Sequence, residues 1–299
     1  MTSGALSPDN GIIAFTAGSL KPALQEIARV FSKSHRPGVD VYFEASGSLD
    51  CVRKATEQGR KVDLIAIADY SIFEQFIIPR YSDWYAMFAT NRMVLCYTKT
   101  SRLYKEINSD NWYRLLLNKG VSYAHTNPNL DPAGYRTLMV WQLAAKHYKQ
   151  PGLDKAFSQS CAREWVYDRA SDLIEALKNG LIDYAFEYAS VAQQNNLEYI
   201  ELPVEINLSN PQYTELYQSA RVNTSGPQGS IIQQIGKPIV YALTVINNAP
   251  HKDLAIEFVR FILGTVGQSI IESAGLQSII PARFKNPAMT PTSFLQNLS

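Results

Sequence analysis

The N-terminal part of the chain repeats one pattern, in which a short apolar run is followed by a turn of small residues and an amphipathic segment. The apolar runs at 12–16, 39–43 and 62–68 have the length of buried strands. Between the first two, the apolar residues of 22–34 recur every three or four positions, which is the spacing of one helix face. Strands that alternate with helices predict the α/β class, with a mostly parallel sheet flanked by helices.

A second block of the same kind follows in the middle of the chain. Strands are expected at 121–125, 182–188 and 198–202, and helices at 131–148 and 171–178. Two such blocks predict two lobes, each built on a mostly parallel sheet. A ligand would then lie in the cleft between the lobes, at the carboxyl ends of the strands.

The chain is expected to cross from one lobe to the other and then to return. Strands near Ala89 and Ile239 mark the two crossings. Residues 203–238 are rich in Asn, Gln, Ser, Gly and Pro, which predicts a long irregular segment with a helical turn at 213–220. The expected limits are residues 1–88 plus 243–299 for lobe I and residues 89–242 for lobe II.

Charge and composition exclude several classes of protein. The 299 residues include 28 Lys and Arg against 27 Asp and Glu, so no basic excess indicates a general binder of nucleic acid or anionic membranes. No apolar run is long enough to span a bilayer. The start at 1–5 does not resemble a signal peptide, which fits either a cytoplasmic protein or a mature form with a replacement Met. Three distant Cys and four His predict neither a thiolate zinc site nor a disulfide framework.

Helix starts with small polar residues indicate an anion site. The turns at 17–20 and 46–49 each place Ser residues where free backbone N–H groups and the helix dipole favour negative charge. The alternative is that Ser19 and Ser46 or Ser48 only cap their helices. The segments 131–134 and 168–171 begin two more helices, and Asp131 itself has the position of an N-cap. The start of a further helix follows Tyr188, whose hydroxyl could reach the cleft.

Other chemistry has less support. The chain contains no nucleophile elbow, no dinucleotide fingerprint and no phosphate-binding P-loop. His125 lies at a strand end, and a hydrolytic Ser–His pair stays open as a minor alternative. Arg136 could bring a positive charge to the cleft or form a surface or interlobe salt bridge. Glu187, which a regular strand turns away from the face of Tyr188, is treated as outside the site.

Along nearly its whole length the chain resembles the archaeal-type molybdate/tungstate-binding proteins of ABC importers, the ModA/WtpA family. The stretches that carry the resemblance are AGSL at 17–20, EASGS at 44–48, IADY at 67–70, FATN at 88–91, DPAGYR at 131–136, IDYAFEY at 182–188, IELP at 200–203, INLS at 206–209 and GKPIVY at 236–241. The resemblance implies a two-lobed periplasmic-binding-protein-like fold of type II that closes on one oxyanion. It also implies a location outside the cytoplasm, with a permease as partner.

The resemblance also implies a set of site residues. The expected set is Gly18, Ser19 and Ser46 from lobe I, and Asp131, the backbone N–H near Ala133, the position of Ala170 and Tyr188 from lobe II. In the family two carboxylates reach the metal of the oxyanion, and Asp131 would be one of them. The second, a Glu, is Ala170 here, and the frequent Cys of the DPCG motif is Ala133. Either Asp131 acts alone, or Glu164 or Asp168 substitutes, or the ligand differs.

We therefore expect a non-enzymatic receptor that carries molybdate or tungstate to a membrane permease, without a cofactor and without nucleic acid as a partner. The receptor is expected to act as a monomer, either free or lipid-anchored. One alternative is a receptor for a protonated oxyanion such as phosphate or arsenate, which could donate to a lone Asp131. The others are a hydrolase that uses His125 and a cytoplasmic effector-sensing domain, which would need an attached DNA-binding segment.

Overall fold

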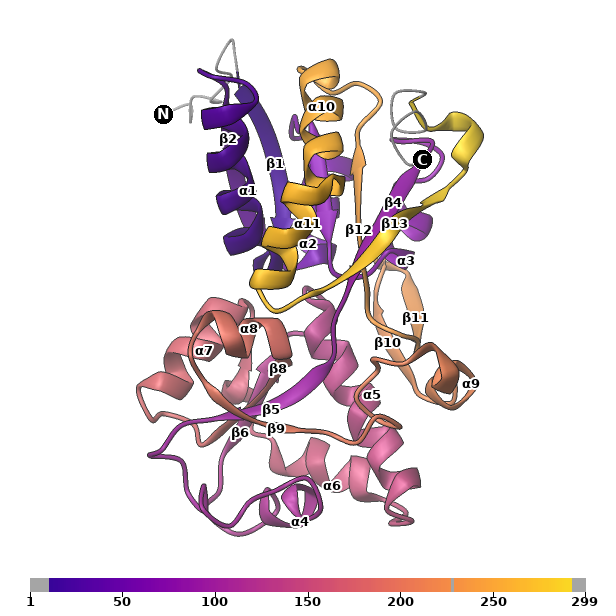
Figure 1. Ribbon diagram of the computed structural model, residues 1–299. Helices are drawn as coiled ribbons and strands as arrows, with labels where there is room; N and C mark the ends of the chain where they lie inside the picture. Colours follow the sequence, from indigo (N-terminus) through magenta and orange to yellow (C-terminus); the bar gives the residue numbers. More distant parts are fainter. Residues whose placement is uncertain (1–10, 227–228, 292–299) are drawn as a thin grey trace, which may run out of the picture.

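The computed structural model describes residues 11–226 and 229–291, which form two lobes joined by a narrow waist (Figure 1). Lobe I contains the N-terminal and C-terminal parts of the described chain, and lobe II the middle part. The α/β class and the two-lobed architecture are those predicted from the alternation of strands and helices. Each lobe has its own sheet, flanked by helices.

The sheet of lobe I has six strands, in the order β13-β4-β12-β3-β1-β2. Its members are β1 (Gly11–Ala17), β2 (Asp40–Ser46), β3 (Leu64–Ile67), β4 (Tyr85–Thr90), β12 (Val240–Val245) and β13 (Gln277–Lys285). The helices of this lobe are α1 (Lys21–Ser34), α2 (Ser48–Thr56), α3 (Ser71–Phe76), α10 (Lys252–Leu263) and α11 (Thr265–Ser273). The apolar stripe of α1 is buried as predicted, with Leu24, Ile27 and Phe31 fully covered.

The sheet of lobe II has five strands, in the order β7-β6-β8-β5-β9. They are β5 (Met93–Tyr97), β6 (Tyr123–Thr126), β7 (Val166–Tyr167), β8 (Tyr184–Tyr188) and β9 (Glu198–Glu201). The helices are α4 (Trp112–Leu115), α5 (Pro132–His147), α6 (Leu153–Ser160), α7 (Ala170–Lys178) and α8 (Ala189–Gln194). Aromatic rings fill the core of this lobe, where Trp141 packs on Phe157 and Phe186.

Most strands of each sheet run in one direction, as expected, and each sheet also contains reversed strands. In lobe I, β1 runs parallel to β2 and β3, whereas β12, β4 and β13 pair antiparallel. In lobe II, β6 is parallel to β7 and β8, and β5 is antiparallel to β8 and β9. The first strand that each crossing brings into a sheet, β5 in lobe II and β12 in lobe I, runs against both of its neighbours. Strand β13, which follows α10 and α11 within lobe I, is also reversed.

The crossings lie close to the expected lobe limits. Strand β4 belongs to the sheet of lobe I as far as Thr90, and β12 joins the same sheet at Val240. The limits expected at 88/89 and 242/243 therefore fall inside these two strands. The chain crosses at about residues 91–92 and returns at about 236–239.

The segment predicted to be irregular contains a β-hairpin, which is a correction. Strands β10 (Arg221–Ser225) and β11 (Ile231–Ile235) pair antiparallel after a short helix, α9 (Thr214–Tyr217), at the position of the expected helical turn. Gln142 of α5 holds Arg221 through two backbone hydrogen bonds of 2.8 and 2.9 Å. The hairpin is thus joined to lobe II, and Gln75 of lobe I also bonds to Gln234 of β11. The strand β13, in a region where we expected none, completes the edge of the sheet in lobe I.

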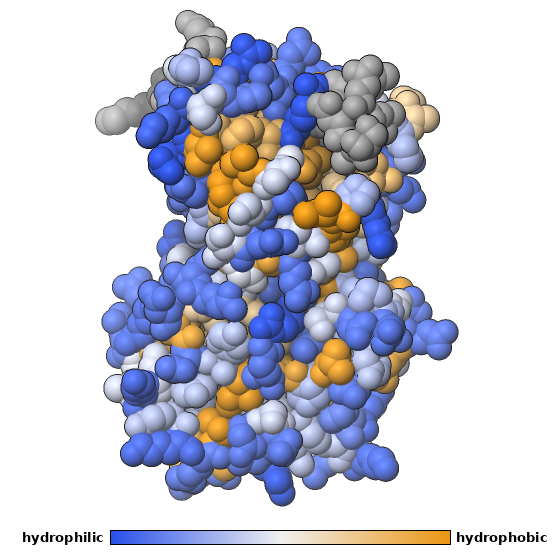
Figure 2. Space-filling model, in the orientation of Figure 1, coloured by the Kyte–Doolittle hydropathy of each residue, from blue (hydrophilic) through white to orange (hydrophobic). Residues whose placement is uncertain are grey.

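The surface is mainly hydrophilic on the face shown in Figure 2, and hydrophobic residues gather on lobe I. Within residues 11–226 and 229–291, no single helix has the length and apolarity to cross a membrane. Helices α10 and α11 meet such a criterion only together, with a bend of 63° between them.

Candidate functional site

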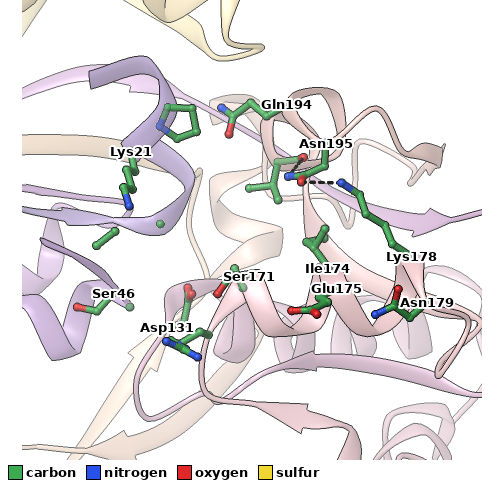
Figure 3. A pocket seen from close by; sticks show the side chains of 17 residues that line it. Lys21, Ser46, Asp131, Ser171, Ile174, Glu175, Lys178, Asn179, Gln194 and Asn195 are labelled. Carbon is green, nitrogen blue, oxygen red and sulfur yellow. Dashed lines mark hydrogen bonds between the residues drawn. The ribbon is translucent and has the colours of Figure 1, made fainter. Parts of the chain in front are cut away.

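A cavity of about 540 Å³ lies between the lobes, and both contribute to its wall (Figure 3). Lobe I provides the turns that lead into α1 and α2, including Gly18, Lys21, Ser46 and Gly47. Lobe II provides Asp131 at the start of α5 and the first turn of α7. Four helix starts from two lobes therefore meet at one cavity, as the sequence predicted.

The Ser residues of lobe I do not cap their helices. Helix α2 takes Gly47 as its N-cap, and no side chain in the described part of the chain caps either α2 or the 3-10 turn Gly18–Leu20. Ser48 instead accepts a hydrogen bond from the N–H of Ala68, at 3.0 Å. The capping alternative is therefore wrong for Ser19 and Ser46, and their hydroxyls are left for another role.

Gly47 is the point at which the two lobes touch beside the cavity. A Cβ atom placed on Gly47 would lie 2.0 Å from the carbonyl oxygen of Leu130, which is one residue from Asp131. The backbone of Gly47 is in the extended region, so the absent side chain serves the contact and not the conformation. The lobes can approach this closely only because residue 47 is glycine.

Asp131 caps α5, as its sequence position predicted. Its Oδ1 accepts the N–H of Ala133 at 2.9 Å, and Pro132 occupies the first helical position. Partial burial raises the pKa of Asp131 to about 6, against the opposing effects of the Ala133 N–H and the charge of Arg136. The backbone N–H of Ala133, which was predicted to bind the anion, thus already donates to the carboxylate of Asp131.

Four of the predicted site residues line the cavity, namely Gly18, Ser46, Asp131 and Ala170. The other three are buried directly behind the wall. Ser19 is 7% exposed, and Ala133 and Tyr188 are 0% and 1% exposed. The structure brings the set together between the lobes, and the roles of its members stay predictions.

Arg136 forms a buried interlobe ion pair rather than a free charge in the cavity. Its Nη2 lies 3.1 Å from Oδ2 of Asp69 in lobe I, and its Nη1 donates to the carbonyl of Ala68 at 2.8 Å. Lys237, on the returning crossing, lies 3.1 Å from the other oxygen of Asp69. Although burial opposes it, the charges of Lys237 and Arg136 hold the pKa of Asp69 well below its usual range. The sequence offered this salt bridge as one of two roles for Arg136.

Glu187 is the residue that sequence reasoning placed outside the site and the structure brings near it. Its side chain is 1% exposed, and Oε1 accepts the N–H of Tyr188 at 2.9 Å. Oε2 is buried, and among residues 11–226 and 229–291 it has no hydrogen-bond partner. Burial and, next, the negative charge of Asp131 raise the pKa of Glu187 to about 8. A buried carboxyl group close to neutral charge therefore lies within electrostatic reach of Asp131.

The two carboxylates proposed as substitutes at the Ala170 position do not reach the cavity. Glu164 and Asp168 are exposed, and Asp168 accepts a hydrogen bond from Asn127 at 2.9 Å. Glu175 of α7 does line the cavity. No local pattern predicts this position for Glu175, because the face of α7 that turns to the other lobe depends on how the lobes pack.

Cationic side chains surround the cavity more densely than anionic ones. Lys21, Arg169 and Lys178 line it, against Asp131 and Glu175. Arg169 is paired with Asp172, and Lys178 donates to Asn195. Within the described part of the chain, Lys21 has no hydrogen-bond or ion-pair partner. The field in the cavity therefore favours an anion although the chain as a whole is almost neutral.

His125 has no catalytic surroundings. It is 4% exposed, its Nδ1 bonds the carbonyl of Thr126 at 2.7 Å, and its ring packs edge-on against Trp141. Burial lowers the pKa of His125, which keeps the ring neutral. Because the ring belongs to the core of lobe II, a Ser–His pair at the cavity has no support from the geometry.

Comparisons of the sequence and of the fold with known proteins both find solute-binding proteins. The sequence profile of bacterial extracellular solute-binding proteins matches residues 12–277. An uncharacterized solute-binding protein of Petrotoga mobilis is 45% identical, over 94% of this chain and 87% of its own. The molybdate/tungstate-binding protein WtpA of Pyrococcus abyssi is 37% identical, over 87% of this chain and 82% of its own. The periplasmic molybdate-binding protein of Azotobacter vinelandii has a similar fold, with a TM-score of 0.59, 18% identity, and coverage of 90% and 99%.

Proposed function

The chain belongs to the family of bacterial extracellular solute-binding proteins, and we propose that it captures molybdate or tungstate between its lobes and delivers the oxyanion to an ABC importer. The observation that carries this proposal is the cavity in which Ser46, Gly47 and Asp131 face one another from different lobes. The relatives named for molybdate and tungstate support the choice of ligand.

The mechanism is a closing motion. In an open form each lobe presents its helix starts to water, and an anion that bonds to both lobes stabilises the closed form. The Gly47–Leu130 approach belongs to that closed form. About 5–8 charge-assisted hydrogen bonds in a cavity of low water content would supply the affinity. The membrane permease would then recognise the closed arrangement of the two lobes.

Asp131 raises the question of how a carboxylate faces a dianion. Two negative groups repel unless the carboxylate bonds to the metal of the oxyanion or shares a proton. Oδ1 of Asp131 is occupied by the Ala133 N–H, so Oδ2 is the oxygen left to reach the metal. We assign Asp131 as a direct ligand of the metal in the oxyanion. At position 170 this chain has Ala where the family has its second carboxylate, so the cavity wall lacks that group.

A protonated oxyanion such as phosphate or arsenate is the second candidate ligand. Two observations favour it, namely the absence of a carboxylate at Ala170 and the free Oδ2 of Asp131, which could accept a proton from the ligand. A fully ionised sulfate has no proton to donate there. This candidate keeps the receptor function and changes only the cargo.

The remaining parts of the proposal follow from the same reading. Membership in the family of extracellular solute-binding proteins supports a location outside the cytoplasm. We assign it no enzymatic activity and no cofactor, since the anion itself is the cargo. We also propose that it works as a monomer, with or without a lipid anchor.

Calorimetric titration with tungstate, molybdate, sulfate and phosphate, at pH 6 and pH 8, tests the proposal. We expect tight binding of tungstate or molybdate and much weaker binding of sulfate. Tight binding of phosphate with no binding of tungstate would select the second candidate. Absence of binding to all four anions would contradict the function itself.

A further inference from the structure

Asp69 is a buried carboxylate at which three distant parts of the chain meet. It follows strand β3 in lobe I, whereas Tyr135 and Arg136 lie near the start of α5 in lobe II and Lys237 lies on the returning crossing. The side chain of Asp69 is 1% exposed and does not line the cavity, so contact with an anion does not account for it. A buried carboxylate costs free energy unless charged groups and hydrogen bonds compensate it. The partners of its two oxygens therefore show how this charge is held.

The oxygen Oδ1 of Asp69 has its partners in lobe I and on the crossing. The N–H and the hydroxyl of Ser71 donate to it at 3.0 and 2.8 Å. Nζ of Lys237 lies 3.1 Å from the same oxygen. These three contacts do not involve the body of lobe II, so they compensate the carboxylate whether or not the lobes are together.

The oxygen Oδ2 of Asp69 has its partners in lobe II. The hydroxyl of Tyr135 donates to it at 2.8 Å, and Nη2 of Arg136 lies 3.1 Å away. Within residues 11–226 and 229–291 this Nη2 makes no hydrogen bond, so its contact with Oδ2 is an ion pair that depends on charge. The two oxygens thus divide their partners between the lobes, and a separation of the lobes would break only the contacts of Oδ2.

Arg136 likewise keeps partners inside its own lobe. Its Nη1 donates to the hydroxyl of Tyr188 at 2.6 Å, and its guanidinium lies 5.8 and 5.7 Å from the ring centres of Tyr135 and Tyr188. Breaking a buried ion pair is costly when one charge is left without compensation. Here both charges keep other partners, so the contact between Asp69 and Arg136 can form and break without leaving either charge alone.

Helix α5 connects this ion pair to the wall of the cavity. Asp131 caps the helix and lines the cavity, and Tyr135 is four positions later, which places it on the same side of the helix. Because a helix moves as a rigid element, an anion that brings Asp131 towards lobe I also brings Tyr135 and Arg136 towards Asp69.

We propose that Asp69, Tyr135 and Arg136 form a reversible interlobe lock, in which Oδ2 of Asp69 engages lobe II only in the closed form while Oδ1 keeps its partners in both forms. This inference rests on the proposed function, because the anion is what closes the lobes. Asp69 is a positioning residue, since it stabilises the closed form without touching the anion. The lock therefore raises the affinity for every anion that closes the lobes, and it does so by the same factor.

Asp69→Asn tests the lock, because the amide has the shape of the carboxylate without its charge. Tungstate, molybdate and phosphate are titrated by calorimetry into wild type and variant. We expect about 30-fold weaker binding of each anion that wild type binds, with the ratios of their affinities unchanged. An affinity equal to that of wild type would overturn the lock. Altered ratios would also overturn it, because Asp69 would then act on the anion and not on closure.

Asp63→Asn is the matched control for loss of a buried carboxylate. Asp63 directly precedes the same strand, is 0% exposed, and accepts the N–H groups of Ile13 and His251 at 2.8 and 2.6 Å within lobe I. This variant should lower the melting temperature of the ligand-free protein and leave the affinities as in wild type. Anion binding weakened as much as in Asp69→Asn would overturn the lock, since general instability would then explain both variants. A wild type that binds none of the three anions would contradict the proposed function, on which the lock depends.

Tyr135→Phe keeps the inference testable if Asp69→Asn does not fold. This change removes only the hydroxyl that donates to Oδ2, so we expect about fivefold weaker binding of each anion. Tyr123→Phe is its control, because the hydroxyl of Tyr123 is bonded to the carbonyl of Phe157 within lobe II. Unchanged affinities in Tyr135→Phe, or an equal loss in Tyr123→Phe, would overturn the lock.

Discussion

The two lobes bring different chemistry to the cavity. Lobe I contributes hydroxyls and backbone at the turns around Ser19 and Ser46, and the side chains behind them are donors. Lobe II contributes Asp131 and, behind it, Glu187, and both of these carboxyl groups have raised pKa values. The difference shows that one wall of the site is insensitive to pH near neutrality, whereas the other changes charge between about pH 6 and 8.

The lobes also differ in how their residues are tied to the contact between them. Gly47 of lobe I is fitted directly against Leu130 of lobe II, while Asp69 of lobe I is joined to Arg136 through a buried ion pair. The Gly47–Leu130 contact is possible only because residue 47 has no side chain. The Asp69–Arg136 contact depends on two opposite charges. Closure therefore depends on shape near the cavity and on electrostatics near the crossings.

The largest expected effect concerns the titratable wall. Glu187→Gln replaces the buried carboxyl by a neutral amide of the same shape. Because the folded-state pKa of Glu187 is raised, the folded protein holds a proton that the unfolded chain has lost, and stability falls as pH rises towards 8. Between pH 6 and 9 wild type should lose about 3 kcal/mol of unfolding free energy more than the variant.

Urea denaturation at several pH values measures this difference. Glu198→Gln, at an exposed site on β9, is the control and should follow wild type. If the free energy of unfolding depends on pH in the same way for wild type and Glu187→Gln, the lobe II wall does not change charge as we propose.

The next effect concerns the close contact between Gly47 and Leu130. Gly47→Ala puts a methyl group within 2.0 Å of the Leu130 carbonyl and so blocks full closure. Each lobe keeps its own core, so we expect about 100-fold weaker oxyanion binding with little change in stability. Calorimetry and small-angle scattering with and without tungstate measure affinity and closure. Gly264→Ala, where a methyl group has ordinary contacts, should behave as wild type, and normal closure in Gly47→Ala would refute the role of this glycine.

Asp131→Ala separates capping from ligand binding. Loss of an N-cap costs about 1 kcal/mol of stability. Loss of a metal ligand should weaken tungstate binding more than that, by about 30-fold, and should affect sulfate less. Titration with both anions, together with thermal unfolding, gives the two numbers. An unchanged affinity for tungstate would leave Asp131 with only its structural role.

The smallest expected effect comes from adding a further carboxylate to the lobe II side of the cavity. Ala170→Glu places a carboxylate at the cavity wall, where the family has one. If the local backbone has the family's geometry, selectivity for tungstate over sulfate should rise about tenfold. Competition titration of tungstate against sulfate measures the ratio. A folded variant with no gain would mean that the start of α7 is placed differently here.

Local signals in the sequence predicted elements of both lobes. Apolar periodicity and small turns are local signals, and they located α1, α2 and the turns at Ser19 and Ser46. Asp131 with Pro132 was equally local, and its cap is confirmed. The reversed direction of β5 and β12 was not predicted, because strand direction after a crossing depends on the path of the whole chain.

The sequence could not show which side chains become buried against residues that are far away along the chain. Glu187 has the alternation of a strand residue, and nothing local shows that Asp131, 56 positions earlier, acts on it. The hairpin of β10 and β11 was hidden in the same way, since its polar composition is typical of loops and its place is set by contacts with α5. The assignment of individual side chains to the anion stays a prediction from the family resemblance.

The most direct test of the account is a crystal structure of the protein grown with tungstate, with anomalous scattering recorded at the tungsten absorption edge. We expect a single strong anomalous peak between the lobes, within bonding distance of Asp131 and with its oxygens on the Ser46 turn. A peak on the outer surface of one lobe, or an empty cavity at saturating tungstate, would contradict a two-lobe oxyanion receptor.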